Sequence, residues 1–113
     1  MVKQHMPRDE VILQDIRNAA RLVMEFVQGY DKPTFLDDWK TQSAVLYQLT
    51  VIGEAVKRLP KEFRASHPEV PWMLIAGMRD NLIHGYDLTD WDEVWKTASK
   101  DVPELLDKIE SYL

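Results

Sequence analysis

Residues 13–30, LQDIRNAARLVMEFVQGY, contain the pattern that decides the fold class. Apolar side chains recur in this stretch at alternating intervals of three and four residues, at Leu13, Ile16, Ala20, Val23, Val27 and Tyr30. Because an α-helix turns once in about 3.6 residues, this spacing places one apolar stripe along a single helical face. Pro7 suits a first turn and Gly29 suits a stop, so the sequence predicts a helix over roughly residues 8–28.

Three later segments show stripes of the same kind. One follows a capping signal at Thr34 and Asp37, is interrupted by an expected bend near residues 38–41, and ends before Pro60. A short apolar helix is expected over residues 72–84, with Gly85 as its C-terminal cap. The last stripe runs from residue 91 to the C-terminus, and Pro103 predicts either a kink or two helices, the second capped by Asp101.

The chain therefore reads as one all-α domain over residues 1–113. No segment shows the period-two alternation of a strand, and 113 residues are too few for two independent cores. Sequential amphipathic helices joined by short connections are typical of an up-and-down antiparallel bundle, here of four or five helices.

Composition excludes several kinds of chemistry. The chain has no cysteine, which rules out disulfides, thiolate metal sites and cysteine nucleophiles, and its three histidines are scattered, so neither a metal nor another cofactor is expected. The net charge of −5 argues against nonspecific polyanion binding, although residues 57–84 hold five basic and three acidic residues. No apolar run approaches the ~20 residues of a membrane span, so we expect a cytoplasmic protein without membrane contact.

Polar residues cluster in the apolar segment 78–86, MRDNLIHGY. On an ideal helix Asp80, Asn81 and His84 would share one face, whereas Arg79 would lie about 140° from His84 and would reach the same spot most easily from a symmetry-related copy. The plain structural alternative is that His84 bonds free carbonyls at a helix end and that Arg79 is a surface ion-pair partner.

The same cluster can support RNA cleavage without a metal. His84 can exchange a proton near neutral pH, and the Arg79 guanidinium matches phosphate oxygens. In such a reaction the ribose 2′-OH attacks the adjacent phosphorus, His84 moves the proton, Arg79 stabilises the developing charge, and Asp80 or Asn81 orients the imidazole. An Arg-x4-His spacing alone is a weak signal, because it is common by chance.

A more specific signal comes from several stretches in order: IGEAVKRLP at 52–60, FR at 63–64, HP at 67–68, VPW at 70–72 and IAGMRDNLIHGY at 75–86. Together they resemble the HepT-like HEPN toxins, and the similarity extends over nearly the whole chain. The resemblance implies a HEPN-type helical domain that forms a homodimer, with the Arg-x4-His motifs of both copies lining a cleft at the two-fold axis.

The resemblance also implies a function. Members of the family are metal-independent endoribonucleases and act as toxins of type VII toxin–antitoxin systems. The resemblance leaves two candidate substrates, tRNA and mRNA. Their partner is an MntA-type nucleotidyltransferase that transfers AMP to the tyrosine of Arg-x4-His-x-Tyr. Arg79 and His84 match the catalytic positions, and Tyr86 matches the modified tyrosine. Negative charge and an adenine at Tyr86 would block a docking RNA phosphate.

Two alternatives stay open at this stage. Lys57, Arg58, Lys61 and Arg64 are candidates for contact with the RNA backbone, or they are ordinary solvated charges. The chain could also be a non-catalytic nucleotide- or substrate-binding subunit of a two-component nucleotidyltransferase. RNA would then survive incubation with the protein, and nucleotide affinity would rise only when both chains are mixed.

Overall fold

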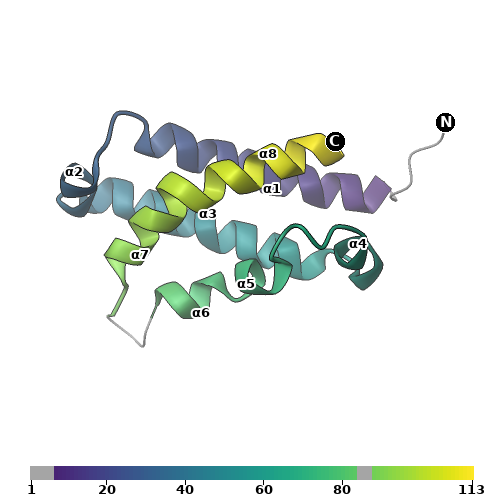
Figure 1. The fold of residues 1–113 in the computed structure, drawn as a ribbon. Helices are drawn as coiled ribbons and strands as arrows, with labels where there is room; N and C mark the ends of the chain where they lie inside the picture. The colour runs from purple at the N-terminus through teal and green to yellow at the C-terminus, as the bar shows by residue number, and fades with distance from the viewer. Residues whose placement is uncertain (1–6, 84–87) are drawn as a thin grey trace.

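The computed structural model describes residues 7–83 and 88–113, and these fold into a helical bundle (Figure 1). Its long rods are α1 (Pro7–Val27), α3 (Trp39–Arg58), and a continuous rod in which α7 (Trp91–Lys96), the π-helical turn η1 (Thr97–Asp101) and α8 (Val102–Tyr112) follow one another. The helices α5 (Trp72–Ala76) and α6 (Met78–Leu82) form a shorter, broken rod, and α2 (Lys32–Leu36) and α4 (Lys61–Ser66) lie in the connections.

Successive rods run in opposite directions in Figure 1, and α8 returns alongside α1. The described residues form no strand, and Ile83 and Thr89 make a single isolated bridge. The all-α class and the up-and-down bundle are thus confirmed. Counted as rods, the structure has four. The short α2 is an additional helix that the apolar stripes did not separate, and α4 occupies residues 61–66, where the sequence allows one or two helical turns before the prolines at 68 and 71.

The predicted stripe of α1 lies in the core. Leu13, Ile16, Ala20 and Val23 are completely buried, and Val27 and Tyr30 are half-buried at its end. They pack with buried residues from α3 and α8, among them Leu49, Ile52, Val56 and Ile109. Each completely buried Leu or Ile contributes on the order of 2 kcal/mol, so this interface between distant parts of the chain holds the bundle together.

The expected bend before α3 is a complete break with two caps. Asp31, not Thr34, caps α2: its Oδ1 accepts from the Thr34 amide at 3.0 Å, and the Thr34 hydroxyl accepts from the Asp31 amide at 3.0 Å. Asp38 then caps α3 and accepts a hydrogen bond from the Thr41 amide at 3.1 Å. The reciprocal cap at Asp31 and the side-chain cap at Asp38 explain why the chain stops and restarts, because each satisfies amides that have no helical partner.

Asp38 makes the stability of this corner depend on pH. The Tyr30 hydroxyl, with the Thr41 amide and hydroxyl, holds the pKa of the Asp38 carboxyl at about 2, below its usual 3.8. The stabilisation is therefore complete above pH 3.8 and is lost as the pH falls through about 2.

We expect Asp38→Asn to lower the melting temperature by several degrees at pH 7 and to weaken the fall in melting temperature between pH 4 and pH 2. Thermal unfolding followed by circular dichroism at the three pH values measures this. Asp37→Asn, at an exposed neighbouring carboxylate, is the matched control and should behave like the parent protein. An Asp38→Asn protein with the parent's acid profile would contradict the assignment.

At Pro103 the structure differs from both expected forms. Asp101 has helical angles, φ −73° and ψ −39°, and makes no side-chain cap, so α8 is not a separately capped helix. The five residues of η1 instead form a π-helical turn directly before α8. A proline lacks the amide hydrogen and its ring clashes with the carbonyl four residues earlier, and a wider turn relieves both problems without ending the rod.

Gly53 lets α5 approach α3 closely. A Cβ atom built at this position would lie 3.1 Å from the Ile75 carbonyl oxygen and 3.7 Å from that of Ala76. The first distance is shorter than ordinary van der Waals contact, and the group that must move is backbone. Gly53 therefore determines how deeply the broken rod of α5 and α6 sits on the bundle.

Gly53→Ala should destabilise the protein, because overpacking of this kind costs roughly 1–3 kcal/mol whereas alanine regains at most about 1 kcal/mol of helix propensity. Urea unfolding should show a lower midpoint with an unchanged slope. Gly77→Ala is the control, since its Cβ would lie at an ordinary 3.5 Å from the Met73 carbonyl oxygen. A higher midpoint for Gly53→Ala than for the parent would refute the close approach.

Candidate functional site

Arg79 lies on the outer surface of α6. Met78 and Leu82, four residues apart, are buried and fix this short helix on the core, so Arg79, Asp80 and Asn81 between them point away from it and are exposed. Within the described part of the chain the Arg79 side chain forms no ion pair. A guanidinium in this situation is available to an external anion.

The helix that carries Arg79 ends earlier than the sequence predicted. Ile83 has extended angles, φ −116° and ψ 111°, and forms a bridge with Thr89, so the predicted helix to residue 84 with Gly85 as its cap is wrong. The Asp90 amide also donates to the Leu82 carbonyl at 2.8 Å. Pairing with the start of α7 satisfies this end of α6 in place of another helical turn.

This early end changes the expected grouping of side chains. Asp80 and Asn81 would share one face with His84 only on a continuous helix, and α6 stops at Leu82. His84 and Tyr86, the other two residues of the predicted motif, lie outside the described residues. The Ile83–Thr89 bridge and the hydrogen bond from the Asp90 amide to the Leu82 carbonyl join the end of α6 to the start of α7.

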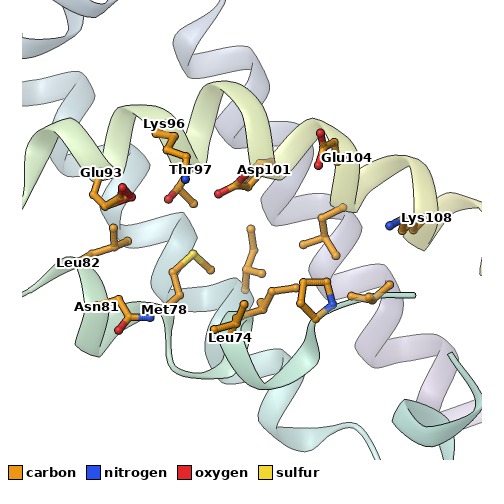
Figure 2. A pocket seen from close by; sticks show the side chains of 16 residues that line it. Leu74, Met78, Asn81, Leu82, Glu93, Lys96, Thr97, Asp101, Glu104 and Lys108 are labelled. Carbon is orange, nitrogen blue, oxygen red and sulfur yellow. The ribbon is translucent and has the colours of Figure 1, made fainter. Parts of the chain in front are cut away.

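Asn81 lines a groove between α6 and the long C-terminal rod, whereas Arg79 does not (Figure 2). The groove has a volume of about 400 Å³. Residues two positions apart in a helix point about 200° apart around its axis, so Asn81 and Arg79 face nearly opposite sides of α6. The structure therefore does not bring Asn81 together with Arg79. Asp80, which does not line the groove either, is closer to Arg79 around the helix than Asn81 is.

The groove itself is apolar inside and mostly acidic at its edge. Figure 2 shows Leu74, Met78 and Leu82 facing the charged residues of the C-terminal rod. Those charged residues are three carboxylates and two ammonium groups: Glu93, Asp101, Glu104, Lys96 and Lys108. Lys108 is already engaged, because its Nζ donates to the Glu69 carbonyl at 3.1 Å. An edge with this excess of carboxylates disfavours a phosphate chain.

The four basic residues of the predicted RNA contact fall into two pairs. Lys57 Nζ lies 3.1 Å from Glu54 Oε2, and Arg58 Nη2 lies 3.1 Å from Asp15 Oδ2 on α1. Lys61 and Arg64 make no ion pair within the described residues and line a second groove, between α4 and α5. The first pair is neutralised locally and the second is not.

Sequence reasoning missed Met73 and Leu74, which are 75% and 67% exposed on α5. A signal for them was present, since the inward positions Trp72, Ile75 and Met78 leave both residues off the buried stripe. Their exposure makes an apolar surface beside Lys61 and Arg64.

The described residues contain neither a cluster of metal-ligating side chains nor a membrane-spanning helix. Across residues 7–83 and 88–113, no three His, Cys, Asp or Glu side chains lie close enough to hold a metal ion. In the same residues, no helix is both long enough and apolar enough to cross a bilayer.

The fold and the site define a class of small all-helical bundles that expose an arginine on a short helix, five residues before a histidine and seven before a tyrosine. The family model described as "Ribonuclease HepT-like" matches residues 16–112. The chain belongs to the HepT-like ribonuclease family, as its resemblance to HEPN toxins predicted.

Curated relatives agree with this assignment. A Thermococcus cleftensis protein named "Probable ribonuclease HepT" is 46% identical over 98 residues, which cover 87% of this chain and 89% of the relative. A Caldanaerobacter subterraneus protein named "Putative RNase TTE0752" is 42% identical, covering 89% and 90%. A third, from Methanocaldococcus jannaschii and named "Putative RNase MJ0125", is 36% identical, covering 96% and 95%. No solved structure matches the chain significantly.

Proposed function

We propose that this chain is a metal-independent endoribonuclease and the toxin of a toxin–antitoxin pair. The observation that carries the proposal is Arg79, exposed on α6 with no ion pair in the described chain, five residues before His84 in a HepT-like ribonuclease sequence. The names of the relatives, all of which mention RNase or ribonuclease, support RNA as the substrate.

The proposed reaction is transesterification within the RNA. The ribose 2′-oxygen attacks the adjacent phosphorus, the bond from phosphorus to the 5′-oxygen breaks, and a 2′,3′-cyclic phosphate and a 5′-hydroxyl result. One group must accept the 2′-OH proton and another must donate a proton to the leaving oxygen. His84 exchanges these protons, Arg79 stabilises charge on the non-bridging oxygens, and Asp80 is the candidate to orient the imidazole.

A homodimer would supply both proton-transfer groups. Two copies of His84 at a shared cleft can act as base and acid in one turnover, and two copies of Arg79 can hold the same phosphate. The proposal therefore includes a two-fold symmetric cleft to which each protomer contributes its Arg-x4-His motif. An RNA substrate of this kind also places the protein in the cytoplasm.

The proposed antitoxin is an MntA-type nucleotidyltransferase that transfers AMP to Tyr86. The adduct places a phosphate and an adenine two residues from His84. Its negative charge repels the RNA phosphate, and its volume fills the space that the substrate needs.

Incubation of the purified, unmodified protein with total RNA in the presence of a chelator tests the activity. We expect fragments that end in 2′,3′-cyclic phosphates. The RNA could instead stay intact while nucleotide binding appears only after a nucleotidyltransferase partner is added. That result would refute the ribonuclease proposal and favour a non-catalytic binding subunit. RNA cleavage that stops in the chelator would refute the metal-independent mechanism.

A further inference from the structure

A second groove of about 550 Å³ lies between α4 and α5. Its apolar lining comes from the connector and α5, including Val70, Trp72, Met73 and Leu74. Its charged lining consists of Lys61 and Arg64, and none of the lining residues is acidic. In a chain of net charge −5, this combination of apolar surface and uncompensated positive charge favours an anionic ligand with apolar parts.

Both cations of this groove have unused hydrogen-bonding capacity. Arg64 Nη1 contacts the Met73 sulfur at 3.6 Å, and the buried Nε of Arg64 has no hydrogen-bond partner among the described residues. Lys61 is exposed at the other edge. Because a thioether is a weak acceptor, the Arg64 guanidinium is held in place without being neutralised. Lys57 and Arg58, by contrast, already face Glu54 and Asp15.

The apolar part of the groove is open to solvent. Met73 and Leu74, at 75% and 67% exposure, are among the most exposed large apolar residues of the described chain. Single-stranded RNA presents flat, apolar base faces next to regularly spaced phosphates, whereas a duplex keeps its bases stacked inside. The juxtaposition of an exposed apolar surface with two free cations therefore matches a single strand better than a duplex.

We propose that the α4–α5 groove binds single-stranded RNA next to the cleaved bond, with Lys61 and Arg64 on phosphates and a base against Met73 and Leu74. The inference rests on the proposed ribonuclease function. Met73 and Arg79 lie six residues apart in the chain, on the consecutive helices α5 and α6, so their backbones are at most roughly 22 Å apart, and an RNA of only a few nucleotides reaches from the groove to Arg79.

Binding of a fluorescently labelled oligouridine to full-length protein carrying His84→Ala, which keeps the RNA intact, tests the groove. In this background Lys61→Gln with Arg64→Gln should weaken binding about tenfold or more. It should also reduce the slope of log K against log salt by about 1.4, the value for two lost phosphate contacts on a single strand. Lys57→Gln with Arg58→Gln removes the same charge from residues that already have acidic partners, and should change both quantities much less.

Two more variants separate the parts of the surface. Lys61→Gln alone, at an exposed position, should reduce the salt slope by about half as much and guards against misfolding of the double variant. Leu74→Ser should weaken binding without changing the slope, because it removes apolar contact and no charge. Melting curves close to that of the His84→Ala parent establish that each variant is folded.

The outcomes distinguish the groove from the proposed function. If the unsubstituted protein cleaves RNA but the two double variants lose affinity equally, the groove proposal fails and the ribonuclease stands. The groove proposal also fails if the Lys61→Gln, Arg64→Gln variant loses as much affinity for duplex RNA as for oligouridine. It fails as well if the two substitutions weaken binding to anionic lipid vesicles but not to oligouridine. If the unsubstituted protein neither binds nor cleaves RNA, the proposed function fails together with the groove.

Discussion

Arg79→Ala is expected to lower the rate of RNA cleavage by roughly one hundredfold to one thousandfold while leaving the protein folded. Removal of one donor that stabilises transition-state charge typically costs this much. Arg79 is exposed on α6, and its side chain makes no ion pair within residues 7–83 and 88–113, so its loss should leave the helix folded. Initial rates on a labelled RNA under single-turnover conditions measure the effect.

The identity of the charged group can be tested at the same position. Arg79→Lys keeps the charge but loses the planar fork that matches two phosphate oxygens, so we expect an intermediate rate. Lys40→Ala, at an exposed residue of α3, is the matched control and should cleave like the parent. His84→Ala is a further test of the same mechanism. It should lower the rate of RNA cleavage roughly one hundredfold to ten-thousandfold.

The double substitution decides whether the two residues act together. The effects of substituting two groups that serve one transition state are strongly non-additive. The double variant Arg79→Ala with His84→Ala should therefore cleave RNA almost as fast as the slower of the two single variants. Fully multiplicative losses would indicate two independent roles. Parent-level cleavage in either single variant would remove that residue from the mechanism.

Co-expression with an MntA-type nucleotidyltransferase, the proposed antitoxin, is expected to produce the second large effect. Intact-mass spectrometry should show additions in multiples of one AMP, and the modified protein should lose RNA cleavage because the adduct's charge and volume exclude the substrate. The same protein purified without the transferase should cleave RNA and carry no adduct.

A matched pair of tyrosine variants locates the adduct. Tyr86→Phe should receive no AMP and should escape silencing. Tyr47→Phe removes a hydroxyl from a tyrosine that is 66% exposed on α3, and should be modified and silenced like the parent. Adducts that persist on Tyr86→Phe, or loss of cleavage without any adduct, would contradict AMP transfer to Tyr86 as the means of control.

Much of the fold could be predicted because helix periodicity is a local property. The stripe from Leu13 to Val23 is buried as predicted, because its spacing depends only on residues close together in the chain. The helix boundaries were harder to predict. Two boundaries differ from the prediction: Asp31 caps α2 in place of Thr34, and a π-helical turn precedes Pro103. Both depend on which of several permitted local geometries the packed chain adopts.

The candidate site could be predicted only in part. Segment 78–86 was identified from its residues, and Arg79 is exposed as a phosphate-binding residue must be. A shared helical face for Asp80, Asn81 and His84 requires a helix that continues to residue 84, whereas α6 ends at Leu82 and Ile83 pairs with Thr89; His84 itself lies outside the described residues. The pairing joins residues six positions apart, and no helical wheel contains it.

From the amino-acid order alone follow the all-helical class, the buried faces and the Arg79, His84 and Tyr86 motif, since each depends on residues near one another in the chain. Only the packed molecule decided which cations are free. Asp15 on α1 neutralises Arg58 across 43 positions, whereas Lys61 and Arg64 face an apolar groove without an acid. Charge compensation acts through space, so it is settled by how the helices pack and not by where the charges lie in sequence.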